Sequence, residues 1–292
     1  MNLSRRTVLA GANGATSSGA SRFSLKYAPH EGSFKSRGNR LEQIAFAADQ
    51  GFTAWEDNEA ATRSIADQSA MARALDQRGM TMGVFVASMP RWGDFRPLLG
   101  GNDDGDRTRF LADIRASVDV AKRLNARHMT IVTGFMDRKL PVDIQTARVI
   151  DVLRRAAEIY EPHGLVMVME PLNTLVNHPG VFLRTVPQGF AVAKGVDSRA
   201  VKVLADLYHE QIQAGNLIAT MDACWDEIDY VQFGDNPGRN EPGTGEINYQ
   251  NVVRWLRARK FAGVIGMEHG NSVEGRAGEE RLIAAYRAID AA

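Results

Sequence analysis

Short apolar runs alternate along this chain with longer segments in which apolar residues recur at helical spacing. Eight runs predict strands: residues 24–29, 53–58, 81–88, 128–134, 165–169, 201–209, 230–235 and 263–269. Between them lie segments such as 107–125, where Phe110, Ile114 and Val118 fall on one helical face. Strict alternation of strands and helices predicts a parallel sheet. Eight such units in roughly 270 residues predict a single closed (β/α)8 barrel, the TIM barrel architecture.

The segments that connect the strands fit this architecture. Further helices are predicted over residues 142–163, 187–195, 249–260 and 278–291, whereas 210–228 is helical or irregular. Residues 90–106 form a long loop rich in Gly, Asp and Pro, with Trp92 and Phe95 as side chains to bury. The main rival is an open doubly wound sheet that binds a dinucleotide. That fold needs GxGxxG after its first strand, and the turn APHEGSFKSRG lacks it.

Composition excludes several classes of function. The 292 residues include 44% hydrophobic side chains, and 35 basic residues balance 35 acidic ones. A net charge of zero gives no reason to expect a nucleic-acid or membrane-surface partner. Cys224 is the single cysteine, so neither an internal disulfide nor a cysteine zinc site can form. No apolar run approaches the ~20 residues that span a bilayer.

The first 22 residues are set apart from the barrel, which is expected to occupy residues 23–292. The sequence SRRTVL, Ser4 to Leu9, resembles a twin-arginine export signal, and Ser18 to Ala20 would supply a cleavage site. The apolar region is short and interrupted, which is equally typical of a disordered leader. Both interpretations stay open. The location is therefore cytoplasmic, or periplasmic if the signal acts.

Four successive strands carry an oxygen-bearing side chain at or near their ends: Glu170, Asp206, Gln232 and Glu268. In a (β/α)8 barrel these ends meet at the face that holds the active site. Three carboxylates and an amide, without a thiolate, suit a hard divalent cation such as Mg²⁺ or Mn²⁺. Each residue taken alone is more simply a helix cap or an ion-pair partner. Their joint occurrence on strands five to eight favours a metal site.

Other polar residues flank these four. His209 lies three residues after Asp206, and Arg239 lies in the Gly/Pro-rich loop after strand seven. Either side chain would have an ordinary structural role, a histidine bonded to a carbonyl or a solvated arginine. Either could instead contact substrate, since arginine grips a carboxylate in bidentate fashion. Weaker candidates for lining the pocket are His30, Glu56 and His178.

The second half of the chain resembles a known family. EPLN at Glu170, DLYHEQIQAGNL from Asp206, YVQFGDNPGRNEPGTGEINY from Tyr230 and GMEHG around Glu268 are similar to the hydroxypyruvate isomerase family, within the xylose isomerase-like barrel superfamily. The similarity covers the chain after the leader and is most specific from Glu170 onward. It departs at His269, where many relatives have an aromatic residue such as tyrosine.

The resemblance implies an isomerase acting on a small molecule. Glu170 and Glu268 would be proton donor and acceptor, and His209 and Arg239 would contact substrate. A divalent cation would be held by Glu170, Asp206, Gln232 and Glu268, with histidine often replacing Gln232 in the superfamily. Hydroxypyruvate would be interconverted with tartronate semialdehyde through a metal-stabilised enediolate. Barrels of this superfamily are often dimers or tetramers, so a homo-oligomer is also implied.

Four alternatives remain at this stage. A ketose 3-epimerase would use the same two glutamates on one carbon, and a 2-oxo-tetronate isomerase would use them on a longer acid. A hydrolytic endonuclease-type barrel would need a zinc cluster rich in histidine, which six scattered histidines and no basic surplus do not favour. A non-catalytic barrel that binds a sugar or an acid would keep the pocket without turnover.

Overall fold

A computed structural model describes residues 20–292 of the chain. The twin-arginine-like motif and most of the predicted leader fall on residues 1–19, outside the described residues. Among the residues that are described, no helix combines the length and the apolarity that crossing a bilayer requires.

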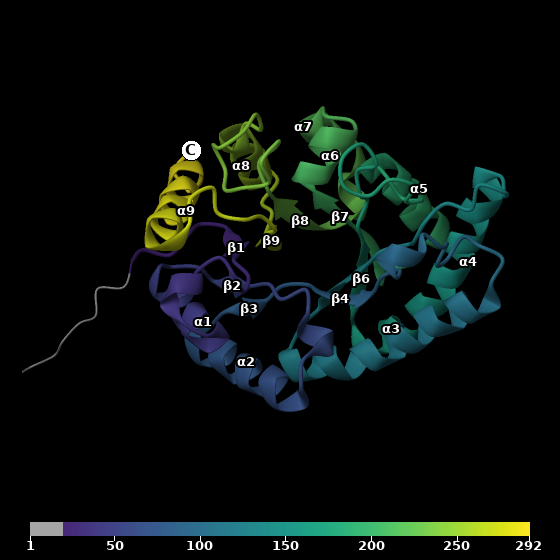
Figure 1. The fold of residues 1–292 in the computed structure, drawn as a ribbon, viewed down its shortest axis with the longest axis horizontal. Helices are drawn as coiled ribbons and strands as arrows, with labels where there is room; N and C mark the ends of the chain where they lie inside the picture. The colour runs from purple at the N-terminus through teal and green to yellow at the C-terminus, as the bar shows by residue number, and fades with distance from the viewer. Residues whose placement is uncertain (1–19) are drawn as a thin grey trace, which may run out of the picture.

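The strands form a parallel barrel (Figure 1). Seven of them pair in the order β1-β9-β8-β7-β6-β5-β4, and β2 pairs with β3. A parallel bridge between His30 and Glu56 joins the ends of the first two strands, and β3 runs on into β4, so the ring closes. Their bounds are β1 (Lys26–Ala28), β2 (Ala54–Trp55), β3 (Thr81–Met82), β4 (Phe85–Ser88), β5 (His128–Ile131), β6 (Val166–Met169), β7 (Val201–Asp206), β8 (Ile228–Phe233) and β9 (Val264–Met267). The predicted (β/α)8 barrel is confirmed.

The third predicted strand is interrupted between β3 and β4. A Cβ atom at Gly83 would lie 2.5 Å from the Tyr230 hydroxyl, which reaches across the barrel from β8. That hydroxyl also accepts a hydrogen bond from the Val84 N–H at 3.3 Å. At this point the Val84 N–H therefore donates to the Tyr230 hydroxyl from the opposite wall of the barrel, and not to the backbone of a neighbouring strand.

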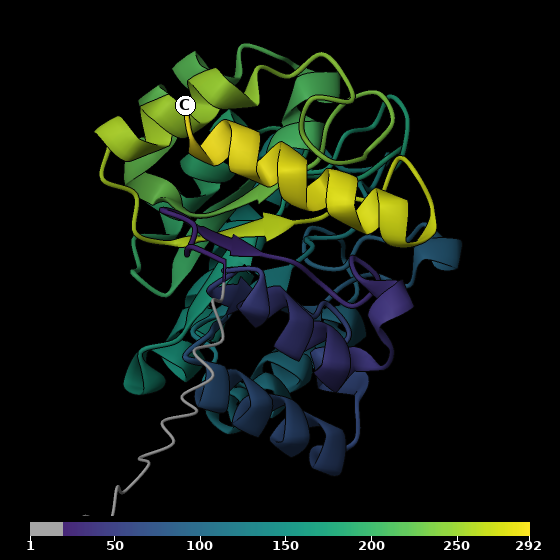
Figure 2. The same ribbon diagram turned by 90° about the vertical axis from the view of Figure 1, so that its left-hand side faces the viewer.

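Nine helices of the described chain surround the barrel (Figures 1 and 2). They are α1 (Arg40–Asp49), α2 (Ile65–Arg78), α3 (Asp104–Leu124), α4 (Val142–Tyr160), α5 (Val186–Val196), α6 (Leu207–Gln213), α7 (Leu217–Cys224), α8 (Tyr249–Ala258) and α9 (Gly275–Asp290). Short 3-10 helices are η1 (Lys35–Arg37), η2 (Ala60–Thr62), η3 (Trp92–Asp94), η4 (Glu161–His163) and η5 (Trp225–Glu227). The region 210–228, helical or irregular in prediction, is thus mostly helical.

Local sequence signals set several helix ends. Asn39 and Glu42 form a capping box that begins α1. Asp103 accepts a hydrogen bond from the Gly105 N–H, so α3 begins within the loop predicted for residues 90–106. Gly79 ends α2 in the left-handed conformation that glycine adopts without strain.

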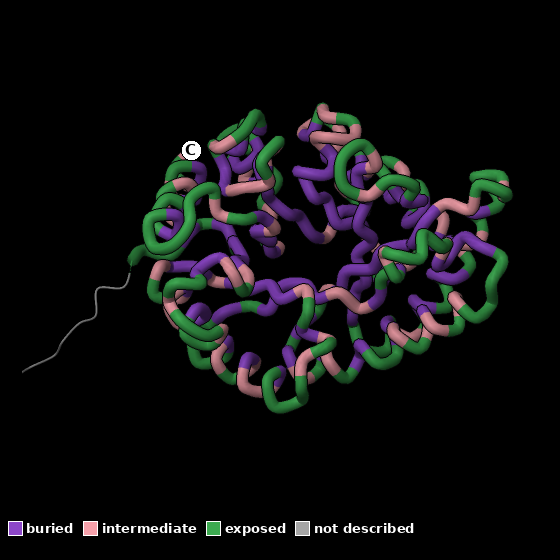
Figure 3. The backbone as a smooth tube through the Cα atoms, in the orientation of Figure 1, coloured by how far each residue is buried: buried purple, intermediate pink, exposed green. Residues whose placement is uncertain are grey.

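Two apolar layers hold the barrel together, and buried residues ring its centre (Figure 3). Along β6, Val166 and Val168 point into the barrel, whereas Met167 and Met169 pack against the helices outside. Both faces are buried, which is why the run carries no polar alternation. The residues of the inner layer are Ala28, Ala54, Val84, Val166, Val168, Leu204, Tyr230 and Val264.

Candidate active site

The alternation of side chains along a strand brings the predicted site residues to one place. Successive residues of a strand point to opposite faces. Because Val168 points into the barrel, Glu170 does too, and the same step leads from Leu204 to Asp206. The residues His30, Glu56 and Gln232 each lie two positions after an inner-layer residue, namely Ala28, Ala54 and Tyr230. Glu268 lies four positions after the inner-layer residue Val264. All six therefore converge inside the carboxyl end of the barrel.

Arg239 bridges two of these carboxylates. Its Nη2 atom lies 3.1 Å from Asp206 Oδ2 and 3.1 Å from Glu268 Oε2. Its Nε donates to the Glu268 carbonyl oxygen at 3.2 Å, and its guanidinium stacks over Tyr208, 4.7 Å from the ring centroid. The loop arginine is thus an ordered part of the site, with a charge that two acidic side chains share.

Glu170, Asp206 and His209 form a buried group with metal-ligand geometry. One ligand atom from each of the three residues lies within 4.8 Å of the other two. His209 Nε2 is 3.6 Å from Asp206 Oδ2 and 3.9 Å from Glu170 Oε1. These three side chains could hold a metal ion.

His209 is fixed in place by its neighbours. Asp206 caps α6 by accepting hydrogen bonds from the backbone N–H groups of Tyr208 and His209. The histidine Nδ1 lies 2.6 Å from the side-chain nitrogen of Asn173, which can only donate, so Nδ1 accepts. Burial, reinforced by Arg239, lowers the pKa of His209 to about 3. The ring is therefore neutral, with its Nε2 directed at the carboxylates.

The carboxylates outnumber the cations at this end of the barrel. Burial first, and then repulsion from Glu268 and Asp206, raises the pKa of Glu170 well above its usual range. Burial also raises the pKa values of Asp206 and Glu268, against the opposing effect of Arg239. With Glu56, four ionised carboxylates beside one guanidinium would carry a net charge of −3. A divalent cation would relieve most of this repulsion.

Gln232 and Glu56 form a second buried group beside the first, with Gln232 in register with Asp206. Gln232 Nε2 donates to Glu56 Oε1 at 2.7 Å, and the Tyr230 hydroxyl donates to Glu56 Oε2 at 2.8 Å. The Gln232 Oε1 atom is buried and has no hydrogen-bond partner among the described residues. Burial and the charge of Glu268 raise the pKa of Glu56 to about 8, while the bonds from Tyr230 and Gln232 oppose this.

The loop that carries Arg239 is built around Asp235. This residue is fully buried, and its carboxylate accepts backbone hydrogen bonds from Asn236, Gly243, Gly245 and Ile247. Its own backbone pairs with Arg239 and Asn240 at 2.7 and 2.8 Å. One carboxylate therefore gathers both ends of the loop and fixes the backbone from which Arg239 projects.

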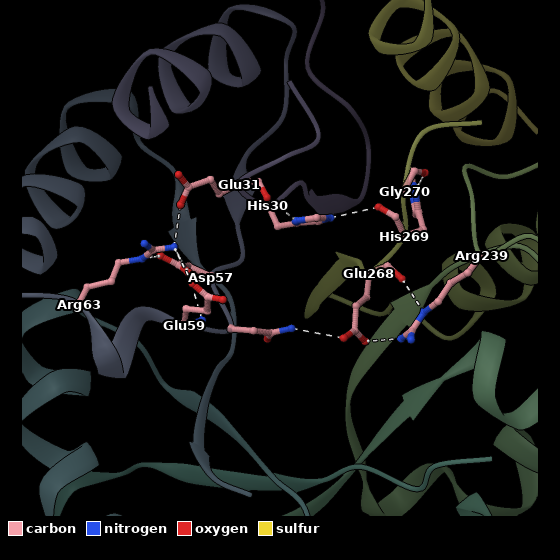
Figure 4. Close-up of a pocket in the computed structure, with 10 residues that line it drawn as sticks. His30, Glu31, Asp57, Glu59, Arg63, Arg239, Glu268, His269 and Gly270 are labelled. Atoms are coloured by element: carbon pink, nitrogen blue, oxygen red, sulfur yellow. Dashed lines mark hydrogen bonds and ion pairs between the residues drawn. The ribbon is translucent and has the colours of Figure 1, made fainter. Parts of the chain in front are cut away.

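A cavity of ≈ 490 Å³ opens beside this site. Figure 4 shows Glu268 and Arg239 on one wall, facing Asp57 and Arg63 on the other. Arg63 is paired with Asp57 at 2.6 Å, and His30 Nε2 reaches the His269 carbonyl oxygen at 3.1 Å. His30 thus lines the cavity as predicted. Apart from Gly270, the residues that line the cavity are of polar or charged types, and Glu268 is one of them.

Sequence analysis missed three contributors to the site. Asn58, two residues beyond Glu56 on the same face, donates from Nδ2 to Glu268 Oε1 at 3.3 Å. The same alternation rule would have found it. Asn173 and Tyr230 act only through contacts with residues distant in sequence, so no local signal pointed to them. His178 lies at the edge, with its ring centroid 5.4 Å from that of His209.

The donor set fits a hard divalent cation. Oxygen atoms predominate among the candidate ligands, and the buried Gln232 oxygen lacks a partner that a cation would supply. The surplus of negative charge points the same way. Of the six histidines, all of them in the described residues, His209 alone belongs to the metal-ligand group.

Comparisons with known proteins agree with this geometry. A family described as xylose isomerase-like TIM barrel matches residues 44–289. The chain is 28% identical over 165 residues to hydroxypyruvate isomerase of Escherichia coli, covering 56% of this chain but only 64% of that protein. It is 28% identical over 233 residues to 2-oxo-tetronate isomerase of Cupriavidus necator, covering 78% of this chain and 86% of that one.

A solved structure supports the same fold. The crystal structure of a protein from Brucella melitensis described as AP endonuclease, family 2, superposes with a TM-score of 0.77 at 26% sequence identity. The alignment covers 87% of this chain and 96% of that one.

Proposed function

We propose that this chain, which belongs to the xylose isomerase-like TIM barrel family, is an isomerase that moves a proton between adjacent carbons of a small hydroxy-oxo acid. The proposed reaction interconverts hydroxypyruvate and tartronate semialdehyde. Relatives named hydroxypyruvate isomerase and 2-oxo-tetronate isomerase support an isomerase of this kind.

The observation that carries the proposal is the pair Glu170 and Glu268. They leave different strands. Burial and the charge of Glu268 raise the pKa of Glu170, and burial and the charge of Asp206 raise the pKa of Glu268, against the opposing effect of Arg239. Carboxylates held in this state suit general acid–base catalysis near neutral pH. Glu170 has no lysine or arginine within 4 Å among the described residues, and Glu268 shares Arg239 with Asp206.

The proton transfers balance without a redox partner. One glutamate removes a proton from C3 of hydroxypyruvate, the carbon that bears the hydroxyl group, and the C3–H electrons form the C2–C3 double bond of an enediolate. A proton is returned to C2 by the other glutamate or by the same one. The O3 proton passes to O2, so that C2 carries a hydroxyl group and C3 becomes an aldehyde. Product and substrate have the same composition.

Substrate binding is assigned to Arg239 and His209. The guanidinium of Arg239 presents several donors beside Glu268, at the wall of the cavity, and suits a carboxylate. His209 is neutral, and its Nε2 is available to a substrate oxygen. The Asp235 loop fixes the backbone of Arg239, so little order has to be gained when substrate binds.

The proposed cofactor is Mg²⁺ or Mn²⁺, held by Glu170, Asp206, Gln232 and Glu268. When bound, the cation polarises the substrate carbonyl and stabilises negative charge on its oxygens. His209 lies beside Glu170 and Asp206, but its Nδ1 accepts a hydrogen bond, so its Nε2 carries the proton and the ring is assigned to substrate and not to the cation. A hydrolytic zinc cluster rich in histidine is not supported, because the metal-ligand group includes a single histidine.

A longer substrate is the second candidate. The cavity of ≈ 490 Å³ offers much more room than a three-carbon acid occupies, and its far wall bears His30, Asn58 and Arg63. This favours a 2-oxo-tetronate, or a ketose if the enzyme is a 3-epimerase, over hydroxypyruvate alone. The same two glutamates would act in each case.

The test is an NMR assay in D₂O with Mg²⁺ or Mn²⁺, offering hydroxypyruvate, a 2-oxo-tetronate and several free ketoses. We expect conversion, with metal-dependent deuterium uptake at one carbon, for at least one of the two acids. Turnover of a ketose alone would replace the isomerase by an epimerase. Binding of these compounds without any exchange would support a binding barrel instead.

A further inference from the structure

We propose that Glu56 is a positioning residue that, with Tyr230, fixes the Gln232 amide so that its oxygen faces the cation. The proposal rests on the proposed function, because it takes Gln232 as a ligand. It adds two residues, neither of which touches substrate or cation, and gives them a defined task.

The donors and acceptors of this buried group allow one arrangement. The Tyr230 hydroxyl accepts from the Val84 N–H, so its own hydrogen is directed to Glu56 Oε2. The Gln232 NH₂ group donates to the other oxygen, Glu56 Oε1. Both oxygens of Glu56 therefore accept, and Gln232 Oε1 is left over.

An amide alone has no such preference. Its oxygen and nitrogen ends are nearly the same size, and a half-turn about the last side-chain bond exchanges them. In its ionised form, which a nearby cation favours, Glu56 only accepts, and that half-turn would set two oxygens against each other at hydrogen-bond distance. An NH₂ group would then face the cation. Glu56 therefore makes the ligand-competent orientation the lower in energy.

The barrel wall leaves space for this group. A Cβ atom at Gly266 on β9 would collide with Glu56 Oε2 and would lie 2.8 Å from Gln232 Cγ. No other residue type fits there without displacing the pair. The side chains of Glu56, Gln232 and Tyr230 are all essentially excluded from solvent. The arrangement is comparable to a carboxylate that orients a metal-bound histidine through its second nitrogen.

The first experiment compares metal binding by wild-type protein and Glu56→Gln, using calorimetric titration with Mn²⁺ alone. The amide that this substitution introduces can offer an NH₂ group to Gln232 and so permits the wrong orientation of the Gln232 side chain. We expect binding weakened by about 10- to 100-fold, the usual effect of losing such a partner. Tyr230→Phe should weaken it less. Glu227→Gln, which removes a buried carboxylate at the opposite end of the barrel, is the matched control and should bind as wild type does.

A double variant separates positioning from a general effect on the fold. If Glu56 acts through Gln232, then Glu56→Gln has little further effect on Mn²⁺ affinity in a protein that already carries Gln232→Ala. Thermal unfolding without Mn²⁺ should show Glu56→Gln to be about as stable as wild type, because an amide of nearly the same size takes the place of a buried carboxyl group. Additive losses in the double variant would contradict positioning.

The outcomes distinguish this proposal from the one it rests on. Wild-type protein that binds no Mn²⁺ would overturn the proposed cation site, and the role of Glu56 with it. Tight binding by both wild type and Glu56→Gln would overturn the role of Glu56 alone. If Glu56→Gln fails to fold, Tyr230→Phe takes its place in the same double-variant comparison. Unchanged Mn²⁺ affinity in the Tyr230→Phe single variant would then reject the proposal.

Discussion

Glu170 and Glu227 are almost equally buried, with 8% and 7% of their surface exposed, but they lie at opposite ends of the barrel. Glu227 precedes β8 and meets two cations, Lys202 at 2.6 Å and Lys194 at 3.2 Å. Glu170 follows β6 and has no lysine or arginine within 4 Å among the described residues. Its nearest basic neighbour is the neutral His209, at 3.9 Å.

The difference separates two uses of a buried carboxylate. At the amino end of the strands Glu227 has two lysine partners of its own, and His128 Nε2 lies 2.8 Å from Asp229 Oδ2. At the carboxyl end several carboxylates share one arginine. A buried carboxylate without a counter-charge, such as Glu170, costs stability. Its presence therefore points to a use other than stability.

The largest expected effect is on catalysis. Glu170→Gln and Glu268→Gln should each lower the rate of deuterium exchange by at least about 10³-fold, because general acid–base catalysis contributes roughly that much or more. Glu170→Gln should not unfold more easily without cation, since it loses a buried carboxyl that has no lysine or arginine partner, whereas Glu268→Gln also loses a partner of Arg239. Exchange rates and thermal unfolding, with Glu227→Gln as control, would check both. Retained exchange in either variant would remove that glutamate from the mechanism.

The two ends of the barrel should also differ when a basic side chain is removed from each. Arg239→Ala should raise the Michaelis constant for an acidic substrate by about 10- to 100-fold, as expected for loss of a charged hydrogen-bond donor worth roughly 1.5–3 kcal/mol. Lys202→Met at the other end should leave that constant unchanged. Steady-state kinetics on both variants make the comparison. An unaltered constant in Arg239→Ala would exclude it from carboxylate binding.

Binding of the divalent cation should stabilise the protein through residues at the carboxyl end of the strands only. At 100 times its dissociation constant, Mn²⁺ should add about 2.7 kcal/mol to the free energy of unfolding, by mass action alone. Chelation should reverse the gain. Glu170→Gln should lose most of it, and Glu227→Gln should keep it. Thermal unfolding at several Mn²⁺ concentrations would show this, and equal gains in all three proteins would place the cation elsewhere.

The smallest effect is expected at the amino end. Glu227→Gln should lower the free energy of unfolding by about 1–3 kcal/mol, because two lysines lose their partner. Exchange activity should not change at a temperature where the variant is folded. Denaturant unfolding, paired with the NMR assay, measures both quantities. Impaired exchange in folded Glu227→Gln would weaken the distinction between the two ends.

The fold and the outline of the site could be predicted from sequence because both depend on short-range patterns. The run from Leu165 to Met169 predicts a strand buried on both faces, and β6 spans Val166–Met169. Given the barrel, the position of Glu170 at a strand end places it at the active-site face. The same reasoning brings in Asp206, Gln232 and Glu268.

What sequence could not supply were the contacts made across the barrel. Tyr230 is apolar enough to pass as a strand residue, and its bond to Glu56 joins positions 174 residues apart. The split between β3 and β4 depends on that same hydroxyl. Arg239 was expected to bind substrate, but its pairing with Asp206 and Glu268 depends on how a loop folds back. Such contacts depend on the three-dimensional arrangement of the chain and produce no periodic pattern in the sequence.

The Asp235 loop has a consequence for how this barrel can change over evolution. Barrel loops usually accept insertions, and new specificities arise that way. Here four backbone N–H groups converge on one buried carboxylate, so an added residue between 236 and 247 would pull some of them away and misdirect Arg239. In a scan of insertions along the chain, this segment should tolerate as little as a central strand does. New substrates would then be acquired through the loops on the other side of the cavity, around Asn58 and Arg63.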